Sequence, residues 1–230
     1  MKTIGIIGGL TWLSTAEYYR LLNEMVNKKL GGVSSAKIII HSVNFHEIKT
    51  LTFAEDWQGI IEILGGIAKK LEDAGADCIL IGANTMHKIA AEVQARVNIP
   101  VIHIASATAT SVKTKGLSKV ALLGTKYTME LGFYQRELQK NNIVTLIPDE
   151  TDRQYIHDAI YNEMGKNIFL PSTKQQFLSI INKLIHEGAE GVILGCTEIP
   201  LLLNQSDCSI PVFDTTLIHT GAAVNYALHE

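Results

Sequence analysis

The chain has 230 residues, of which 47% are hydrophobic, and it carries a formal net charge of −3. This length accommodates one large hydrophobic core or two cores of about 100 residues each. The small negative charge and the lack of any lysine- or arginine-rich run argue against nucleic-acid binding. No apolar run reaches the roughly 18 residues that span a bilayer, and the first residues resemble a strand, not a signal peptide. We therefore expect a cytoplasmic protein with no membrane segment.

The first half of the chain alternates short apolar runs with segments of helical periodicity. A capping-box pattern at Ser14-Thr15-Ala16-Glu17 predicts the start of the first helix, and Ala74-Gly75 predicts the end of the second. The predicted elements, in chain order, are a strand over 3–7, a helix over 14–29, a strand over 37–43, a helix over 60–71, a strand over 78–81, a helix from residue 84 and a strand over 101–104.

The second half continues the same alternation. Its predicted elements are a strand over 120–123, a helix over 128–140, a strand over 143–147, helices over 152–164 and 173–187, strands over 192–194 and 212–213, and a helix over 216–228. Buried strands that alternate with helices are typical of parallel sheets covered by helices. The sequence therefore predicts an α/β fold.

Two stretches of the chain are copies of one another. Residues 74–87 read AGADCILIGANTMH and residues 187–200 read EGAEGVILGCTEIP, so that Ala83 aligns with Cys196 at an offset of 113 residues. Two further pairs of segments extend the repeat in the same order: 3–8 with 119–124, and 99–103 with 210–214. This order indicates an internal duplication.

The duplication predicts two pseudo-symmetric domains, each with a mostly parallel sheet flanked by helices. We expect residues 1–113 plus 213–230 to form the first domain and residues 114–212 the second, because the stretch around Gly116 is the most loop-like crossing. Duplicated domains usually build their site between the copies, so Ala83 and Cys196 are expected to face one cleft from opposite sides.

Polar residues follow the repeated strand in each copy, at the strand end where open parallel sheets bind their ligands. They are Asn84 and Thr85 in the first copy and Cys196, Thr197 and Glu198 in the second. The backbone N–H groups at a helix start favour an anion such as a carboxylate. The same field is expected to lower the pKa of a thiol, which makes the cysteine a candidate base or nucleophile.

These blocks resemble the aspartate/glutamate racemase family, whose members need no pyridoxal phosphate. The resemblance runs almost end to end, through IGIIGGLTWLSTAEYYRLLNE, ANTMHK, LLGTKYTM, GCTEIPLLL and PVFDTTLIH. It implies a racemase of a small acidic amino acid such as aspartate or glutamate, with no cofactor, a homodimeric assembly and two bases on opposite faces of the substrate's α-carbon. GCTE paired with the mirrored NT is the specific part, whereas IGIIGG is common and lacks the dinucleotide pattern G-x-G-x-x-G.

The chain departs from the two-cysteine pattern of that family. Cys196 is the thiol acid/base that the resemblance implies, but the mirrored position is Ala83, which has no proton to exchange. Leu13 replaces the glutamate of GGMxWEST-type relatives. Lys166 lies near the place where some relatives have a cationic substrate-binding residue.

Other polar residues have two interpretations each. Thr11, Ser14, Thr125 and Thr128 are candidates both for substrate contact and for helix capping. Glu198 is a candidate to accept the thiol's proton or to hold the substrate's ammonium group. The substrate-binding candidates are Thr11, Asn84, Thr85, Thr125, Thr197 and Lys166.

The histidines and the remaining cysteines point to no metal. His87 lies one helical turn after Ala83, so it either replaces the missing base by way of water or packs inside the domain. None of the histidines and cysteines has the spacing of a metal site. Cys78 lies inside a predicted strand and is expected to be inert.

Three functions remain open at this point. The first is racemisation with Cys196 as the surviving thiol. The second is a one-base cysteine enzyme, either decarboxylase-like or one that exchanges the α-proton without inversion. The third is a catalytically silent carboxylate-binding protein. The intact GCTE, ANT and GTKYTM blocks favour an amino-acid site, and the racemase is the function that we predict.

Overall fold

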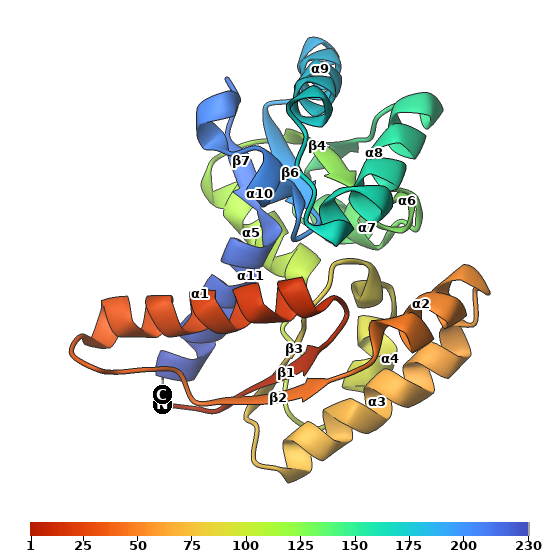
Figure 1. Ribbon diagram of the computed structural model, residues 1–230. Helices are drawn as coiled ribbons and strands as arrows, with labels where there is room; N and C mark the ends of the chain where they lie inside the picture. The colour runs from red at the N-terminus through yellow and green to blue at the C-terminus, as the bar shows by residue number, and fades with distance from the viewer. Residues whose placement is uncertain (230) are drawn as a thin grey trace. The chain divides into compact units, whose positions relative to one another are not determined.

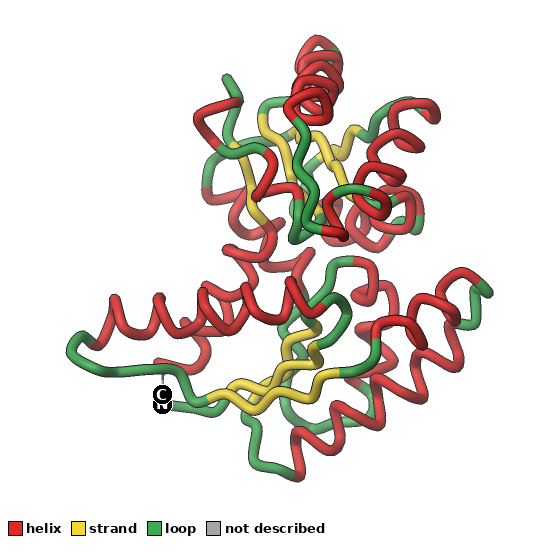
Figure 2. Tube along the Cα trace, viewed as in Figure 1, coloured by secondary structure: helices red, strands yellow, loops and turns green. Residues whose placement is uncertain are grey.

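The computed structural model of the protein describes residues 1–229. The chain forms two units, one made of residues 1–103 with the segment from residue 219 onward, and the other of residues 104–218 (Figure 1). Each unit contains one all-parallel sheet covered by helices (Figure 2). The predicted α/β class with two parallel sheets is therefore confirmed.

The first unit is built on a three-stranded sheet in the order β2-β1-β3. Its elements are β1 (Ile4–Gly8), α1 (Trp12–Leu30), β2 (Ile38–Ser42), α2 (Phe45–Phe53), α3 (Trp57–Asp73), β3 (Cys78–Ile81), the 3₁₀ helix η1 (Thr85–Ile89), α4 (Ala90–Gln94) and the C-terminal part of α11 (Thr215–Leu228). The strand predicted over 101–104 is wrong. Val101 makes only an isolated bridge to Ile79, because the chain turns into a helix at Ile104.

Alternate residues of β1 enter separate hydrophobic clusters on the two faces of this sheet. Ile4 and Ile6 pack with α1 and α11 through residues such as Tyr18 and Val224. Ile7 packs on the opposite face with α2, α3 and α4. Figure 2 shows α1 on one side of the sheet and α3 on the other. The apolar run that predicted a buried strand thus supplies both halves of the core.

The second unit has a four-stranded sheet in the order β5-β4-β6-β7. Its elements are α5 (Ile104–Thr114), β4 (Lys119–Gly124), α6 (Lys126–Glu130), α7 (Phe133–Gln139), β5 (Val144–Leu146), α8 (Glu150–Asn162), the 3₁₀ helix η2 (Met164–Lys166), α9 (Pro171–His186), β6 (Gly191–Gly195), α10 (Ile199–Leu202), the 3₁₀ helix η3 (Gln205–Asp207), β7 (Val212–Asp214) and the start of α11. One continuous core joins the sheet to the helices that cover it.

The unit boundaries differ from those expected from the sequence. Residues 104–113 and 213–218, which we had assigned to the first domain, lie in the second unit. For α5 the reason is packing, because Ile104 and Val112 are fully buried in the second core. For β7 the reason is pairing, because Phe213 lies opposite Ile193 of β6.

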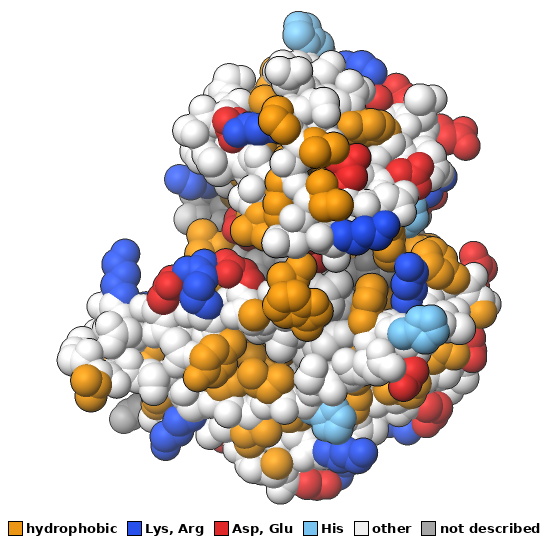
Figure 3. All heavy atoms as spheres, viewed as in Figure 1, with side chains coloured by type: hydrophobic (Ala, Val, Ile, Leu, Met, Phe, Trp, Pro, Cys, Tyr) orange, Lys and Arg blue, Asp and Glu red, His pale blue; other side chains and the backbone are white. Residues whose placement is uncertain are grey.

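The molecular surface carries charges of both signs. On the face seen in Figure 3, lysines and arginines are interspersed with aspartates and glutamates, without one large patch of a single sign. Within residues 1–229, no helix is both long and apolar enough to cross a membrane.

Candidate functional site

In the first unit, α1 is joined to the end of β3 by a buried serine. Thr11 is the N-cap of α1, and its Oγ1 accepts a hydrogen bond from the Ser14 N–H at 3.1 Å. The predicted capping box at Ser14 is therefore wrong, because the helix begins earlier, at Trp12. The Ser14 hydroxyl instead donates to the carbonyl of Gly82 at 2.8 Å and fixes the end of β3.

The segment after β3 is a 3₁₀ turn, not the regular helix predicted from Asn84. η1 covers Thr85–Ile89, and the first α-helical turn comes only at α4. Asn84 is buried, whereas Ala83 and Thr85 are half-buried. The Ala83 carbonyl accepts a hydrogen bond from His87 Nδ1 at 2.8 Å. A 3₁₀ turn has weaker hydrogen-bond geometry than an α-helix, so the anion-binding field expected here is reduced.

In the second unit, the residues after β4 and β6 lie at the same end of the sheet. Gly124 and Gly195 are paired in register, so Thr125 and Cys196 follow adjacent strand ends. A Cβ on Gly195 would lie 2.9 Å from the Leu123 carbonyl oxygen, which explains why this close approach requires glycine. Thr125 is the N-cap of α6 and accepts from the Thr128 N–H at 3.3 Å, so its side chain has the predicted capping role.

Cys196 lies in direct contact with a buried carboxylate. Its Sγ–H donates to Glu198 Oε2 at 2.8 Å, and the Thr197 hydroxyl donates to the same oxygen, also at 2.8 Å. Glu198 is 4% exposed, whereas Cys196 and Thr197 are half-buried. The structure thus brings together the three polar residues that the sequence predicted in the second copy.

The pKa of Cys196 is raised well above its usual range, in contrast to our expectation. Burial is the largest cause, followed by the negative charge of Glu198 and the hydrogen bond to it; the backbone N–H groups of Thr197 and Glu198 act in the opposite direction. The expected lowering is wrong because α10 is only four residues long and the carboxylate touches the sulfur. At neutral pH the thiol keeps its proton. It is an acid, with an acceptor already in place beside it.

We expect Glu198→Gln to lower the pKa of Cys196, because the amide removes the adjacent negative charge. Alkylation by iodoacetamide at pH 7.5 should accelerate by about tenfold for each unit by which that pKa falls. The measurement uses a Cys208→Ser background, because Cys208 is also half-buried. Glu187→Gln, which removes an exposed carboxylate at the end of α9, is the matched control. An unchanged or slower rate would show that Glu198 does not control the thiol.

An aromatic group that was not predicted from the sequence lies near Cys196. His157 and Tyr161 lie one turn apart on α8, with ring centroids 4.8 Å apart, and the ring of Tyr127 lies 5.9 Å from that of His157. Burial raises the pKa of Tyr161, and the neighbouring acidic groups of Cys196, Tyr127 and Glu198 raise it further. The i, i+4 spacing of two aromatic residues on one helix was the available signal.

Lys166 lies at the protein surface, and Asp214 caps the start of α11. Lys166 is exposed on η2, the turn that follows α8. The Asp214 carboxylate accepts from the Thr216 and Leu217 N–H groups at the start of α11, which is a structural role. Among residues 1–229, no three His, Cys, Asp or Glu side chains form a group that could hold a metal ion.

His87 is a packed core residue and not a base facing Ala83. A carbonyl only accepts hydrogen bonds, so the His87 nitrogen beside Ala83, Nδ1, carries the proton. The other nitrogen, Nε2, is buried and has no hydrogen-bond partner among the described residues. The His87 ring lies 4.9 Å from that of His103 and 5.2 Å from that of His219. Burial and these two neighbours hold the pKa of His87 well below its usual range.

The buried histidines predict a loss of stability in acid. Burial lowers the pKa of His219 to about 4, and the pKa of His87 is also lowered. In the unfolded chain a histidine binds a proton near pH 6.5, whereas in the folded protein these two remain neutral at that pH. The free energy of unfolding is therefore highest above pH 6.5 and falls on acidification toward pH 4. Each histidine should lower the free energy of unfolding by about 1.4 kcal/mol per pH unit in that window.

Urea unfolding at pH 7, 6, 5 and 4.5 measures this slope. A His219→Gln variant should be less stable at pH 7 but should show a shallower fall between pH 6.5 and 4. A wild-type free energy of unfolding that stays constant over this range would contradict the assignment.

Known proteins match this chain over almost its whole length. The family model described as Asp/Glu/Hydantoin racemase matches residues 7–223. A crystal structure of a candidate Asp/Glu racemase from Yersinia pestis is 47% identical, with 100% of each chain covered and a TM-score of 0.94. An aspartate racemase homologue from Pyrococcus horikoshii OT3 is 38% identical, again with 100% of each chain covered, and has a TM-score of 0.88.

A further relative of lower identity, also described as an amino-acid racemase, matches nearly the whole chain. The broad specificity amino-acid racemase RacX of Bacillus subtilis is 24% identical over 221 residues, which cover 93% of this chain and 92% of the relative. The family model spans residues 7–223 and therefore includes Ala83, Cys196 and Glu198. The chain belongs to the Asp/Glu/Hydantoin racemase family.

Proposed function

We propose that the protein is a cofactor-independent racemase of a small acidic amino acid, aspartate or glutamate, in which Cys196 exchanges the α-proton. The observation that carries this proposal is the hydrogen bond from the Cys196 thiol to the Glu198 carboxylate at the end of β6. The relatives described as Asp/Glu and aspartate racemases support an acidic substrate.

In the proposed reaction, Glu198 controls the proton of the thiol. When the substrate binds, its ammonium group stabilises negative charge on the Cys196 sulfur, and the thiol proton moves to Glu198 Oε2. The thiolate then removes the α-proton, and the electron pair of the C–H bond is delocalised into the substrate's α-carboxylate. For inversion, a water molecule on the Ala83 side delivers a proton to the opposite face of the carbanion, and the resulting hydroxide takes the proton held on Glu198. Return of a proton from Cys196 to the same face, after the thiol has exchanged with solvent, gives exchange without inversion. General acid/base groups of this kind contribute about 10²–10⁴-fold to the rate.

We further propose, from the sequence repeat that aligns Ala83 with Cys196, that these two positions act on opposite faces of the substrate's α-carbon. Thr11, Asn84, Thr85, Thr125, Thr197 and Lys166 would bind the substrate's carboxylates. The protein would act as a homodimer in the cytoplasm. Light scattering at micromolar concentration tests the assembly, and a monomer would count against it.

Ala83 favours a second function, α-proton exchange or another one-base reaction without inversion. Alanine has no ionisable group, so only water could deliver a proton from its side. A decarboxylase-like enzyme needs a single cysteine to protonate one face, which this arrangement also supplies. A silent carboxylate-binding protein would retain the binding residues without turnover.

Incubation with each L- and D-amino acid, without added cofactor, tests the proposal. Chiral chromatography measures inversion, and mass spectrometry in D₂O measures α-proton exchange. We expect exchange with aspartate or glutamate, unchanged by hydroxylamine, which traps pyridoxal phosphate. Binding without exchange of either acid would favour the silent binding protein, and inhibition by hydroxylamine would exclude cofactor-independent chemistry.

A further inference from the structure

A buried cluster of three histidines and one tyrosine lies behind the Ala83 turn. This histidine cluster consists of Tyr18 from α1, His87 from η1, His103 from the segment just before α5, and His219 from α11. Tyr18, His87 and His219 are each at most 1% exposed. In addition, His103 is the last residue of the first unit before α5, and His219 is the first residue after the chain returns. The cluster therefore includes both residues at which the chain leaves and re-enters this unit.

Hydrogen bonds fix opposite tautomers in two of the histidines. His219 Nε2 lies 2.6 Å from the Ile102 carbonyl and must carry a proton, so its Nδ1 accepts from the Tyr18 hydroxyl at 2.8 Å. His87 carries its proton on Nδ1, which donates to the Ala83 carbonyl. The Tyr18–His219–Ile102 chain of hydrogen bonds joins α1, α11 and the segment between α4 and α5. The His87 ring packs against His219 of this chain.

We propose that His87 is a positioning residue, which sets the orientation of the Ala83–Asn84 peptide at the end of β3. In a trans peptide the C=O and N–H groups point in opposite directions, and the described residues contain no cis peptide. Because His87 holds the Ala83 carbonyl toward the buried cluster, the Asn84 N–H points away from it. The proposed function assigns the substrate's carboxylate to that side. This role rests on the proposed function, since it assigns Asn84 to the substrate's carboxylate.

His87 holds the turn after β3 through two hydrogen bonds, one from its ring and one from its backbone N–H. The His87 backbone N–H donates to the Asn84 carbonyl at 3.0 Å, while the His87 ring holds the preceding carbonyl. Ser14 holds the carbonyl before that, at Gly82. Three successive carbonyls, those of residues 82, 83 and 84, are thus fixed by groups from α1 and η1. The orientation of this segment therefore depends on a few specific side-chain bonds.

Two amide variants distinguish the effect of the hydrogen bond to Ala83 from the effect of losing the His87 ring. In His87→Asn, Nδ2 occupies the place of Nδ1 and keeps the bond to Ala83; in His87→Gln, the amide lies one bond farther out and loses it. We expect aspartate affinity, measured by calorimetry, to fall about tenfold in His87→Gln and to stay within about twofold of wild type in His87→Asn. Hydrogen exchange at the residue 87 amide should accelerate about tenfold in His87→Gln alone.

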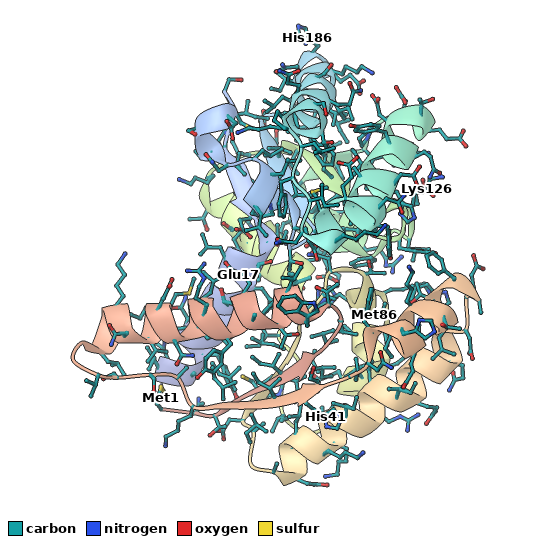
Figure 4. All side chains as sticks on the ribbon, in the orientation of Figure 1. Met1, Glu17, His41, Met86, Lys126 and His186 are labelled. Atoms are coloured by element: carbon teal, nitrogen blue, oxygen red, sulfur yellow. The ribbon has the colours of Figure 1, made fainter. Side chains whose placement is uncertain are left out.

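His186→Gln is the matched control. His186 Nδ1 also lies against the carbonyl four residues earlier, that of Asn182, at 2.7 Å, but it is exposed at the end of α9 (Figure 4). Its loss should change neither aspartate affinity nor exchange at residue 87. Equal behaviour of His87→Asn and His87→Gln, in affinity and in hydrogen exchange, would overturn the positioning role.

Failure of the proposed function would look different. If the wild-type protein binds neither aspartate nor glutamate, the proposed function fails, while hydrogen exchange at residue 87 still tests the control of the turn. If the variants do not fold, ¹⁵N-histidine NMR of the wild-type protein supplies the test. We expect an Nδ1–H tautomer for His87 and an Nε2–H tautomer for His219. An Nε2–H tautomer for His87 would overturn the inference, because the bond to Ala83 would be absent.

Discussion

Replacing Ala83 with cysteine is expected to raise the rate of racemisation by about ten- to a thousandfold, because it supplies the missing acid/base on the second face of the α-carbon. Ala83 follows β3 as Cys196 follows β6, and it is half-buried, so the added sulfur has an accessible side. The Cys196 position shows that a strand end of this fold accommodates a thiol. Polarimetry or chiral chromatography with L-aspartate and with D-aspartate measures the gain.

Ala83→Ser is the matched control for the gain at position 83. A serine hydroxyl has similar size but ionises far less readily, so this variant should remain close to wild type. Undetectable racemisation by Ala83→Cys, with aspartate binding intact, would mean that the site is adapted to one-base chemistry or to binding alone. The racemase proposal would then be replaced by one of those functions.

Replacing Cys196 with serine is expected to reduce α-proton exchange by at least about a hundredfold, because the hydroxyl cannot act as the acid/base at neutral pH. Serine still donates a hydrogen bond to Glu198, so the local structure should persist and substrate binding should be retained. Exchange is measured by ¹H NMR as loss of the α-proton signal in D₂O. Loss of exchange with binding preserved would assign the chemistry to the sulfur.

Cys208→Ser makes the same change at another half-buried thiol, beside η3. It should leave the exchange rate within about twofold of wild type, since Cys208 follows neither of the repeated strands. Cys78 is fully buried in β3, so its substitution should affect stability and not chemistry. A fully active Cys196→Ser enzyme would end the thiol hypothesis.

The sequence predicted the sheets and the strand ends well because both depend on local patterns. Short apolar runs closed by glycine mark β3 and β6, and the repeat shows which residues follow them. Ala83 and Cys196 were therefore placed correctly at the ends of these strands. The same local patterns failed where packing decides. α5 was missed because its first buried residue, Ile104, directly continues an apolar segment that resembled a strand.

The chemistry of Cys196 was less predictable than its place. The sequence suggested a helix N-terminus that would lower the pKa of the thiol, but the pKa depends on which way Glu198 turns. The carboxylate folds back onto the sulfur two residues away, and its charge, together with burial, raises the pKa instead. Spacing alone does not distinguish a side chain that points toward its neighbour from one that points away.

Contacts between residues far apart in the sequence were inaccessible to pattern analysis. The hydrogen bond from Tyr18 to His219 joins positions 201 residues apart, and no periodicity relates them. Likewise, the placement of Tyr161 near Cys196 depends on how α8 packs beside β4. Burial beside His103 and His219, which also lie far from His87 or on other elements, lowers the pKa of His87, and the packing of α8 adds an aromatic neighbour to the thiol.

The central claim is that a single thiol exchanges the α-proton on one face. The most direct measurement follows L- and D-aspartate separately in D₂O, recording α-proton loss by ¹H NMR and chirality by chromatography in the same samples. We expect one enantiomer to lose its α-proton much faster than it is inverted, and expect this exchange to disappear in Cys196→Ser. Inversion as fast as exchange for both enantiomers would contradict the claim, because it would require a second acid/base on the Ala83 side.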